Sequence, residues 1–453
     1  MFKSIKLRNF KGFQNSDIEI SELTILTGAN NSGKSSLTNS ILTILQSNIF
    51  RLELSLNGMY VNLGDYEDVI NNRDINNFLE IGYEVASFNN SFFVNSKWQF
   101  DEIRKLAKFH SLEVRGTCLT LKVSAASKSK AHVKLDYMPE HDMLLKTDKD
   151  KSLENIFENV RTELFNRLIN DKGFSVDLFS EKITNKWSFE EELQIGDRTL
   201  QLMLINKVPY QIIRILDLLF LETNNIKEKS SFIGSLRLPP ERTYYENSNS
   251  DIEVSPTGEN FNDLIVLWKN RNDKKFNELI KVMKKLNLAE SLQTKRITGG
   301  RYELQVRPKK NSPFSSLTDV GFGVSQFLPI IVTDIQKGKN SSLFIAQPET
   351  HLHPSIQADF CDYISDQIKK RNKRYFIETH SEYFLNRLRL NIVNGSIDPK
   401  KVKVYYLVNT GADTEIHLID FMKNGAIKNA PEDFFKTYLM DTMDIAINAV
   451  NKD

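Results

Sequence analysis

The spacing of hydrophobic and polar positions along the chain predicts strands near the start and helices further on. Residues 2–13 alternate between apolar and polar side chains up to a turn at Gly12, and the apolar run 23–27 predicts a buried strand. Alternation returns at 79–85, 119–123 and 133–137. We expect these three segments to be antiparallel strands with one solvated face.

From about residue 150 the spacing changes to that of amphipathic helices. Apolar side chains recur there at steps of three and four residues. They are Leu153, Phe157, Val160, Leu164 and Leu168. A second helical pair is expected over 260–292, and alternation at 402–408 and 414–418 predicts a hairpin.

These patterns divide the chain of 453 residues into three parts. Residues 1–149 would form one half of a domain that includes the antiparallel strands, and 229–453 would form the other half. Between them, 150–228 would be a helical insertion. It has no sustained heptads, which argues against long coiled-coil arms.

One stretch of the sequence matches a known phosphate-binding motif. Residues 28–35, Gly-Ala-Asn-Asn-Ser-Gly-Lys-Ser, fit the pattern G-x-x-x-x-G-K-[ST] at every defined position, between a predicted strand and a predicted helix. Lys34 would reach the β- and γ-phosphates of a nucleotide, and Ser35 would offer its hydroxyl to Mg²⁺. The predicted nucleotide contacts in this loop are Asn30, Asn31, Ser32, Gly33, Lys34, Ser35 and Ser36.

Together with later motifs, this loop resembles the heads of ABC-type ATPases in the SMC, RecF and OLD group. The resemblance rests on the opening IKLRNFKGF, the loop GANNSGKSS, and the segments DVGFGVSQFLPI (319–330), LFIAQPETHLHP (343–354) and YFIETHS (375–381). It implies an α/β fold, namely a P-loop ABC-type ATPase head with a parallel-sheet core, an antiparallel β subdomain and a helical insertion. The tail after residue 423 resembles the branch found in bacterial anti-phage systems such as PARIS and Septu.

The resemblance also implies roles for the later motifs. A glycine-serine turn followed by a helix N-terminus would cap the γ-phosphate that a partner subunit holds. These signature residues are Gly321, Gly323, Ser325 and Gln326. His380 would be the switch histidine at the γ-phosphate, and Glu378 beside it is a candidate for handling the attacking water. His351 and His353 are expected to be structural rather than metal ligands.

The segment 343–354 departs from the family pattern at two acids. Ala346 stands where an acid normally holds the Mg²⁺ shell, and Gln347 stands at the usual catalytic glutamate. Glutamine can orient water but is a far poorer base, and alanine offers a metal nothing. Either Glu349 does metal or base work from a shifted place, or the site binds ATP firmly and hydrolyses it slowly. We expect slow hydrolysis.

Arg237 and Arg242 follow another predicted strand. Arginines there can reach phosphate across an interface, although surface ion pairs are the simpler expectation. The basic run 369–374 is interpreted as a solvated helix end.

Composition limits the partners. The chain has 60 Lys and Arg against 58 Asp and Glu, a formal net charge of +2, so nucleic-acid contact is possible only locally. Cys118 and Cys361 have no metal-ligand spacing, and a reducing cytoplasm fits them. We expect no secretion signal and no membrane span.

Three functions follow from these expectations. The first is an ATP- and Mg²⁺-binding homo-oligomer that holds or gates an effector protein, encoded nearby, in anti-phage defence. The second is a RecF-like or SMC-like ATPase of DNA repair or maintenance, which would bind DNA in a salt-dependent way. The third is a degenerate ATPase that binds nucleotide only for stability.

Overall fold

The chain forms two units, each with its own contacts. The first contains residues 20–39 and those from 229 onward, and the second contains 2–19 and 40–228. The computed structural model describes residues 2–87, 90–127, 129–139, 185–194, 200–204, 207–245, 253–431 and 434. The helical spacing at 153–168 and most of the expected C-terminal extension lie outside these residues. The domain boundaries expected from the sequence remain a prediction.

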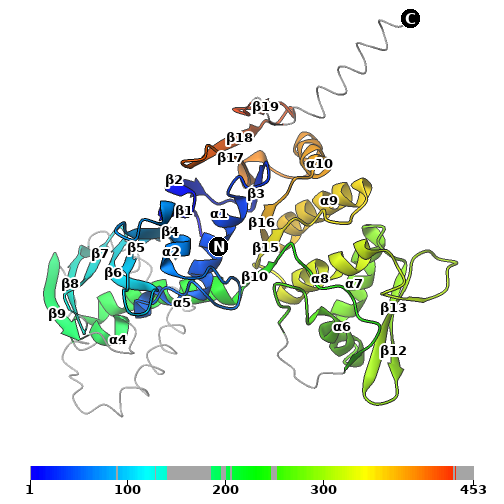
Figure 1. Cartoon of the computed structure of the whole chain (residues 1–453), viewed down its shortest axis with the longest axis horizontal. Helices are drawn as coiled ribbons and strands as arrows, with labels where there is room; N and C mark the ends of the chain where they lie inside the picture. The colour runs from blue at the N-terminus through cyan, green and yellow to red at the C-terminus, as the bar shows by residue number, and fades with distance from the viewer. Residues whose placement is uncertain are drawn as a thin grey trace, which may run out of the picture. The chain divides into compact units, whose positions relative to one another are not determined.

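A mostly parallel sheet forms the centre of the first unit (Figure 1). Among the described residues it has seven strands, and the first five in spatial order run parallel. In spatial order they are β10 (Ser230–Ile233), β15 (Ser342–Ala346), β16 (Arg374–Glu378), β3 (Leu23–Gly28), β17 (Val402–Asn409), β18 (Thr414–Phe421) and β19 (Ile427–Lys428). Strands β3 and β15 are buried along their whole length, as parallel strands covered on both faces are.

Helices follow the parallel strands in turn. They are α1 (Lys34–Gln46) after β3, α9 (Pro354–Arg371) after β15 and α10 (Glu382–Val393) after β16. Parallel strands present their carboxyl ends at one edge of a sheet, and ligands bind at that edge. Glu378 pairs with Ala346 on one side and with Leu26 on the other, so the ends of three strands meet there.

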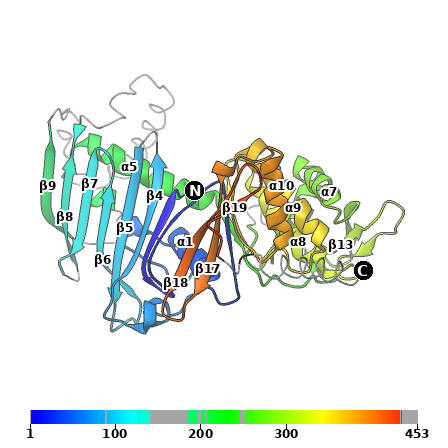
Figure 2. The ribbon, with the colours of Figure 1, turned by 90° about the horizontal axis from the view of Figure 1, so that it is seen from above.

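A helical layer and a small sheet complete the first unit. The predicted pair over 260–292 is confirmed as α6 (Phe261–Asn270) and α7 (Lys274–Lys285), which pack against α8 (Phe322–Lys337). Figure 2 shows α8, α9 and α10 side by side. The small sheet contains β11 (Tyr244–Tyr245), β12 (Ser291–Ile297), β13 (Arg301–Arg307) and β14 (Ser315–Ser316).

The second unit is built on an antiparallel sheet. Its eight described strands confirm the alternation predicted at 79–85, 119–123 and 133–137. In spatial order they are β2 (Phe13–Glu19), β1 (Ser4–Phe10), β4 (Leu79–Ser87), β5 (Asn90–Phe100), β6 (Ala107–Arg115), β7 (Leu119–Ala125), β8 (Lys130–Tyr137) and β9 (Trp187–Gln194). Its helices include α2 (Tyr66–Val69), α4 (Leu200–Leu204) and α5 (Tyr210–Glu228), which packs on β4.

Strand β9 corrects the helical expectation for part of 150–228. It pairs antiparallel with β8 over its whole length, from Lys130 opposite Gln194 to Tyr137 opposite Trp187. Its sequence, WSFEEELQ, has aromatic residues at alternate positions at its start, which suits a strand. The open edge of β8 supplies the hydrogen bonds, and the described residues 200–204 and 210–228 are helical as expected.

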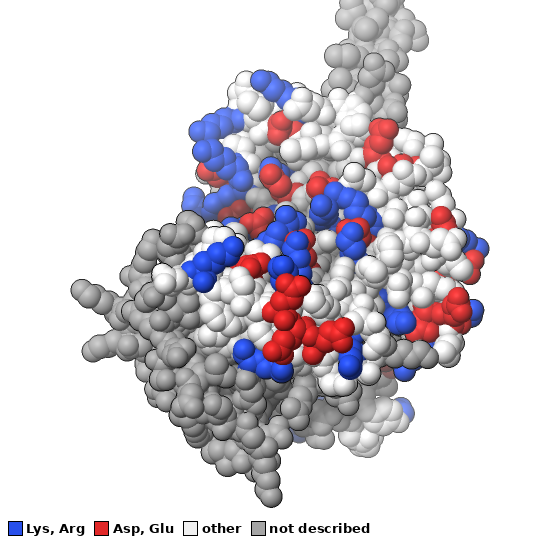
Figure 3. Space-filling view, turned by 90° about the vertical axis from the view of Figure 1, so that its left-hand side faces the viewer, with Lys and Arg blue, Asp and Glu red and all other residues white. Residues whose placement is uncertain are grey.

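Charges of both signs cover this edge of the sheet. Figure 3 faces it and shows acidic and basic side chains next to one another. Three glutamates of β9 pair with lysines. The pairs are Glu190 with Lys134 at 3.0 Å, Glu191 with Lys207 at 2.5 Å and Glu192 with Lys130 at 3.8 Å. Exposed pairs of this kind contribute little stability, but they neutralise the edge.

Candidate functional site

The glycine-rich loop has the backbone that its sequence requires. β3 ends at Gly28 and α1 begins at Lys34, so strand, loop and helix follow in the predicted order. Gly28 has φ +138°, and a Cβ there would lie 2.4 Å from the carbonyl oxygen of Leu407. Gly33 has φ +92°. Any other side chain would be strained at these positions, so both need glycine.

The loop encloses the charge of Lys34. The Lys34 ammonium donates hydrogen bonds to the oxygens of Gly28 at 3.1 Å, Ala29 at 2.6 Å and the Ser32 hydroxyl at 3.2 Å. Burial lowers the pKa of Lys34, while Glu378 and Glu349 oppose that shift. Around this cation, Asn30, Asn31 and Ser35 are exposed, Ser32 is buried, and Gly33 and Ser36 are half-buried.

The hydroxyl of Ser35 donates a hydrogen bond to a carboxylate at the end of β16. Its partner is Oε2 of Glu378, at 2.8 Å. Glu378 is 3% exposed, and burial raises its pKa, against the opposing effects of Thr38, Ser35 and the Lys34 charge. The sequence predicted Glu378 as a residue that handles water, and it missed this contact.

The oxygens of Ser35 and Glu378 fit a Mg²⁺ ion. Mg²⁺ takes oxygen ligands, commonly one or two carboxylates, with phosphate oxygens and waters completing its shell. Among the described residues, no group of three or more His, Cys, Asp or Glu side chains could hold a metal. The donor set at Ser35 therefore suits a cation that arrives with a phosphate.

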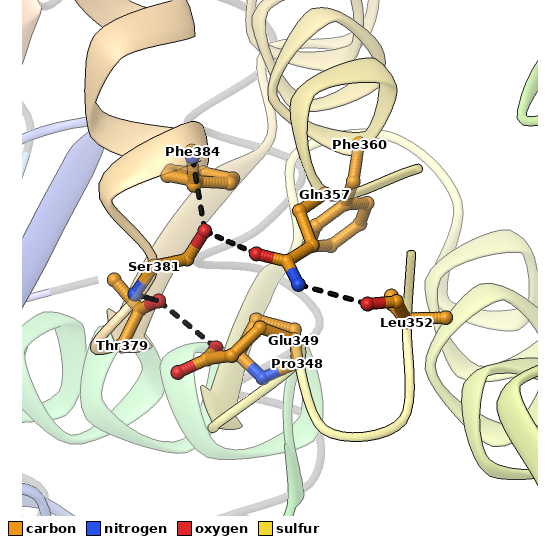
Figure 4. A pocket seen from close by; sticks show the side chains of 8 residues that line it. All are labelled: Pro348, Glu349, Leu352, Gln357, Phe360, Thr379, Ser381 and Phe384. Carbon is orange, nitrogen blue, oxygen red and sulfur yellow. Dashed lines mark hydrogen bonds between the residues drawn. The ribbon is translucent and has the colours of Figure 1, made fainter. Parts of the chain in front are cut away.

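Glu349 is held at the end of β16 by both of its carboxylate oxygens. Oε2 accepts a hydrogen bond from the Thr379 hydroxyl at 2.9 Å, and Oε1 accepts one from the backbone N–H of His380 at 2.7 Å. Figure 4 shows the carboxylate of Glu349 beside Thr379, at the rim of a small pocket. Burial raises the pKa of Glu349. The carboxylate thus has a fixed orientation and a raised affinity for a proton.

Gln347 has an unusual backbone. Its φ is +47°, a left-handed conformation that non-glycine residues seldom adopt. Backbone and side-chain hydrogen bonds hold it there, three of them no longer than 3.1 Å. The N–H of Gln347 donates to the oxygen of Glu378 at 2.8 Å, while its own oxygen accepts from Thr350 Oγ1 at 3.0 Å and Arg237 Nη2 at 3.1 Å. Strain of this kind concentrates at functional sites.

His380 lies at the same edge and is exposed. Partial burial of its ring and the charge of Lys34 nevertheless lower its pKa. The ring is therefore within electrostatic range of the loop lysine, where a switch histidine would have to lie. Its role stays a prediction.

The signature segment differs from the sequence expectation. α8 begins at Phe322, so Gly323, Ser325 and Gln326 belong to its first turns rather than to a loop before it. Ser325 and Gln326 are buried; Ser325 bonds to the oxygen of Phe322, and Gln326 to that of Leu238. Neither side chain is therefore exposed at the surface of the unit, and their role at a phosphate stays a prediction. Gly321 is exposed at the helix N-terminus and can present its backbone.

Gly323 and the nearby histidines have structural contacts. A Cβ at Gly323 would lie 2.7 Å from the oxygen of His351, so the helix and the 343–354 turn approach closely there. His351 also lies against the ring of Phe322, at 5.9 Å between centroids. His353 caps α9, since its Nδ1 accepts a hydrogen bond from the N–H of Ser355 at 3.3 Å.

The two arginines of the loop after β10 differ. Arg242 forms the exposed ion pair that the sequence favoured, with Asp319 at 2.6 Å. Arg237, by contrast, is 7% exposed and binds the backbone of Gln347. Burial lowers its pKa to about 10, and Glu349 opposes the shift. The expectation of a surface ion pair for Arg237 is therefore wrong. Its neighbours Leu236 and Leu238 are exposed, so the sequence around Arg237 did not predict that it is buried.

Comparisons with known proteins were made for the whole chain. The model of a family described as "AAA ATPase domain" matches residues 1–385. Among solved structures, an Smc head domain with an extended coiled coil, bound to the C-terminal domain of ScpA and derived from Pyrococcus furiosus, is similar at 12% identity and a TM-score of 0.40, covering 92% of this chain and 96% of that chain. The SMC head domain from Thermotoga maritima is similar at 10% identity and a TM-score of 0.37, covering 92% and 99%. A search of curated proteins gives no match.

Within the described part of the chain, every helix is too short or too polar to span a membrane.

Proposed function

Because the chain belongs to the AAA ATPase domain family, we propose that it is an ABC-type ATPase that binds ATP with Mg²⁺ on residues 28–35. One observation carries the proposal. The hydroxyl of Ser35 bonds to the buried carboxylate of Glu378 at 2.8 Å, and the charge of Lys34 acts on that same carboxylate. A cation, a hydroxyl and a carboxylate therefore converge at the end of the glycine loop, where a triphosphate and its Mg²⁺ need them.

Lys34 and the N-terminus of α1 would hold the phosphates. The ammonium exchanges its bonds to the loop oxygens for bonds to β- and γ-phosphate oxygens, while the loop N–H groups wrap the β-phosphate. Mg²⁺, when bound, neutralises phosphate charge. Ser35 and Glu378 would hold it, with Glu378 supplying the acid that Ala346, its register partner, lacks.

Hydrolysis would be slow. Gln347 can orient water but cannot take its proton, and both oxygens of Glu349 already accept hydrogen bonds. ATP would then act mainly as a ligand that holds two copies together, with the loop of one copy facing the N-terminus of α8 of the other.

ATP binding would cause a conformational change that is passed to a partner protein. We infer a cytoplasmic homo-oligomer that holds or gates an effector protein in anti-phage defence. The support for this role is the resemblance of the tail after residue 423 to that branch of ABC-type ATPases.

DNA repair or maintenance is kept as a second candidate because of one surface feature. The hairpin of β12 and β13 exposes Lys295, Arg296 and Arg301, and Lys309 and Lys310 follow it. Clustered cations of this kind bind phosphate backbones, and such binding weakens steeply with salt. Salt-dependent retention of duplex DNA, with hydrolysis stimulated by that DNA, would favour this candidate over the effector scaffold.

The first test measures ATP binding by isothermal titration calorimetry in the presence of Mg²⁺. Replacing Lys34 with alanine removes the buried cation of the loop, and we expect ATP affinity to fall by about 100-fold or more. Lys339→Ala, at an exposed position, is the matched control and should bind as the wild type does. A Lys34→Ala protein with wild-type ATP affinity would contradict the proposal.

A further inference from the structure

Arg237 is a buried charged group near this site whose hydrogen bonding is incomplete. Its side chain is 7% exposed, yet Nε and Nη1 have no hydrogen-bond partner among the residues that the structure describes. Only Nη2 is engaged, with the oxygen of Gln347 at 3.1 Å. Buried guanidinium groups are normally paired, because an unmet charged donor is costly to bury.

The position of Arg237 points to an anion rather than to packing alone. Glu349 acts electrostatically on Arg237, and the same carboxylate acts on Lys34. Both cations therefore lie within electrostatic range of Glu349, and Arg237 contacts the Gln347 turn. Since the glycine loop wraps the β-phosphate, a group beyond the loop on this side would meet the terminal phosphate.

We propose that Arg237 is a second phosphate-binding residue of the site, which contacts the terminal phosphate of ATP bound to the same chain through Nε and Nη1. This rests on the proposed function above. A guanidinium suits the task because its planar fork can bind two phosphate oxygens at once. ADP lacks that phosphate, so Arg237 distinguishes ATP from ADP.

The loop of Arg237 also reaches the N-terminal turns of α8. The next residue, Leu238, accepts a hydrogen bond from Gln326 Nε2 at 3.1 Å. Engagement of Arg237 by a phosphate would therefore act on the segment that bears Gly321 and Phe322. This gives the site a route by which one chain's nucleotide alters the surface offered to a second copy.

The test compares ATP and ADP affinities, measured by calorimetry with Mg²⁺ on the full chain. Arg237→Met keeps the length of the side chain and removes its charge and donors. We expect ATP affinity to fall about 10- to 100-fold, as loss of a charge-assisted bidentate contact does, and ADP affinity to change less than about 3-fold. Arg242→Met, in the same loop but paired at the surface, should leave both affinities unchanged.

The ratio of the two affinities decides the outcome. If ATP and ADP weaken equally, Arg237 is a structural residue and the proposal is overturned. An unchanged ratio with both affinities intact overturns it as well. If Arg237→Met does not fold, Arg237→Gln, which removes the charge but keeps a polar side chain, decides in the same way. Failure of the wild type itself to bind ATP would instead refute the proposed function.

Discussion

At the scale of single residues, the chemistry of the site depends on which carboxylates remain near the nucleotide. Glu378 bonds to Ser35, and Glu349 bonds to Thr379 and His380, so each has a separate task. Gln347 contacts the first of these residues, since its N–H donates to the backbone oxygen of Glu378. We propose that this left-handed turn places the Gln347 side chain where a base would act.

Restoring a carboxylate at Gln347 should therefore raise hydrolysis. Gln347→Glu keeps the size of the side chain and supplies a base, and we expect kcat for ATP to rise at least about 10-fold. This is less than the roughly 100- to 10,000-fold that general bases typically contribute, because Glu349 and Glu378 nearby disfavour a third charge. Steady-state phosphate release measures it, and Gln347→Met is the control of equal length without a base.

The opposite result would assign the base to another residue. If Gln347→Glu leaves kcat unchanged while Glu349→Gln abolishes phosphate release, Glu349 is the base, acting from its shifted place. ATP affinity should remain near wild type in all three variants, because Lys34 and Ser35 are untouched.

Several residue roles could be predicted from local sequence, and others could not. The conformation of the loop 28–35 is determined by its own residues. The positions of Gly28, Gly33 and Lys34 therefore agree with the motif. Lys373 illustrates the limit. It belongs to the basic run interpreted as solvated, yet it is 1% exposed and pairs with Asp334 at 2.8 Å. The burial of Lys373 depends on the packing of α8 against the strand that follows this residue. No local sequence pattern predicts that packing.

At the scale of elements, α5 carries a buried acid. Asp217 is 7% exposed, and burial raises its pKa to about 7. The unfolded chain loses this proton near pH 4, whereas the folded chain keeps it until about pH 7, so the folded state binds more protons in between. The stability that Asp217 contributes is thus full below pH 4 and is lost as pH rises through 7.

The variant Asp217→Asn tests this pH dependence of the folding stability. The pKa of Asp217 is about 7 in the folded chain, against an ordinary value of 3.8. At about 1.36 kcal/mol per pKa unit, this difference corresponds to roughly 4 kcal/mol of folding stability. We expect the thermal midpoint of the wild type to fall by several degrees between pH 5 and pH 8 and that of Asp217→Asn to fall much less. Glu222→Gln, at a less buried position of α5, should keep the wild-type decline. Equal declines in all three proteins would show that Asp217 does not titrate in this range.

Helices and strands were predictable where the spacing of apolar residues within the element determines its type. The alternation of β4, β7 and β8 and the helical spacing of α6 and α7 are local properties, and each formed as expected. Strand β9 was missed because its partner, β8, is about 50 residues earlier in the chain. The start of α8 was placed too late, since Gly323 suggested a turn and instead permits the close approach of His351.

At the scale of the whole molecule, the proposed assembly needs two different surfaces of the first unit. The loop 28–35 holds the nucleotide, and the N-terminus of α8 would meet the nucleotide of a second copy. Gly321 is exposed there, and a Cβ at this position would meet open space among the described residues. A side chain can therefore be added without disturbing the fold.

Gly321→Glu places a negative charge where the partner's phosphates would approach. The charge suits the helix N-terminus itself, so the folded state and ATP binding should be unaffected. Facing a triphosphate, it costs several kcal/mol, and we expect ATP-dependent association to weaken at least about 100-fold. Native mass spectrometry with ATP and Mg²⁺ measures the dimer fraction, and Gly321→Ala, which adds no charge, should dimerise as the wild type does. If Gly321→Glu still forms an ATP-dependent dimer, the N-terminus of α8 does not face the nucleotide, and another surface joins the two copies.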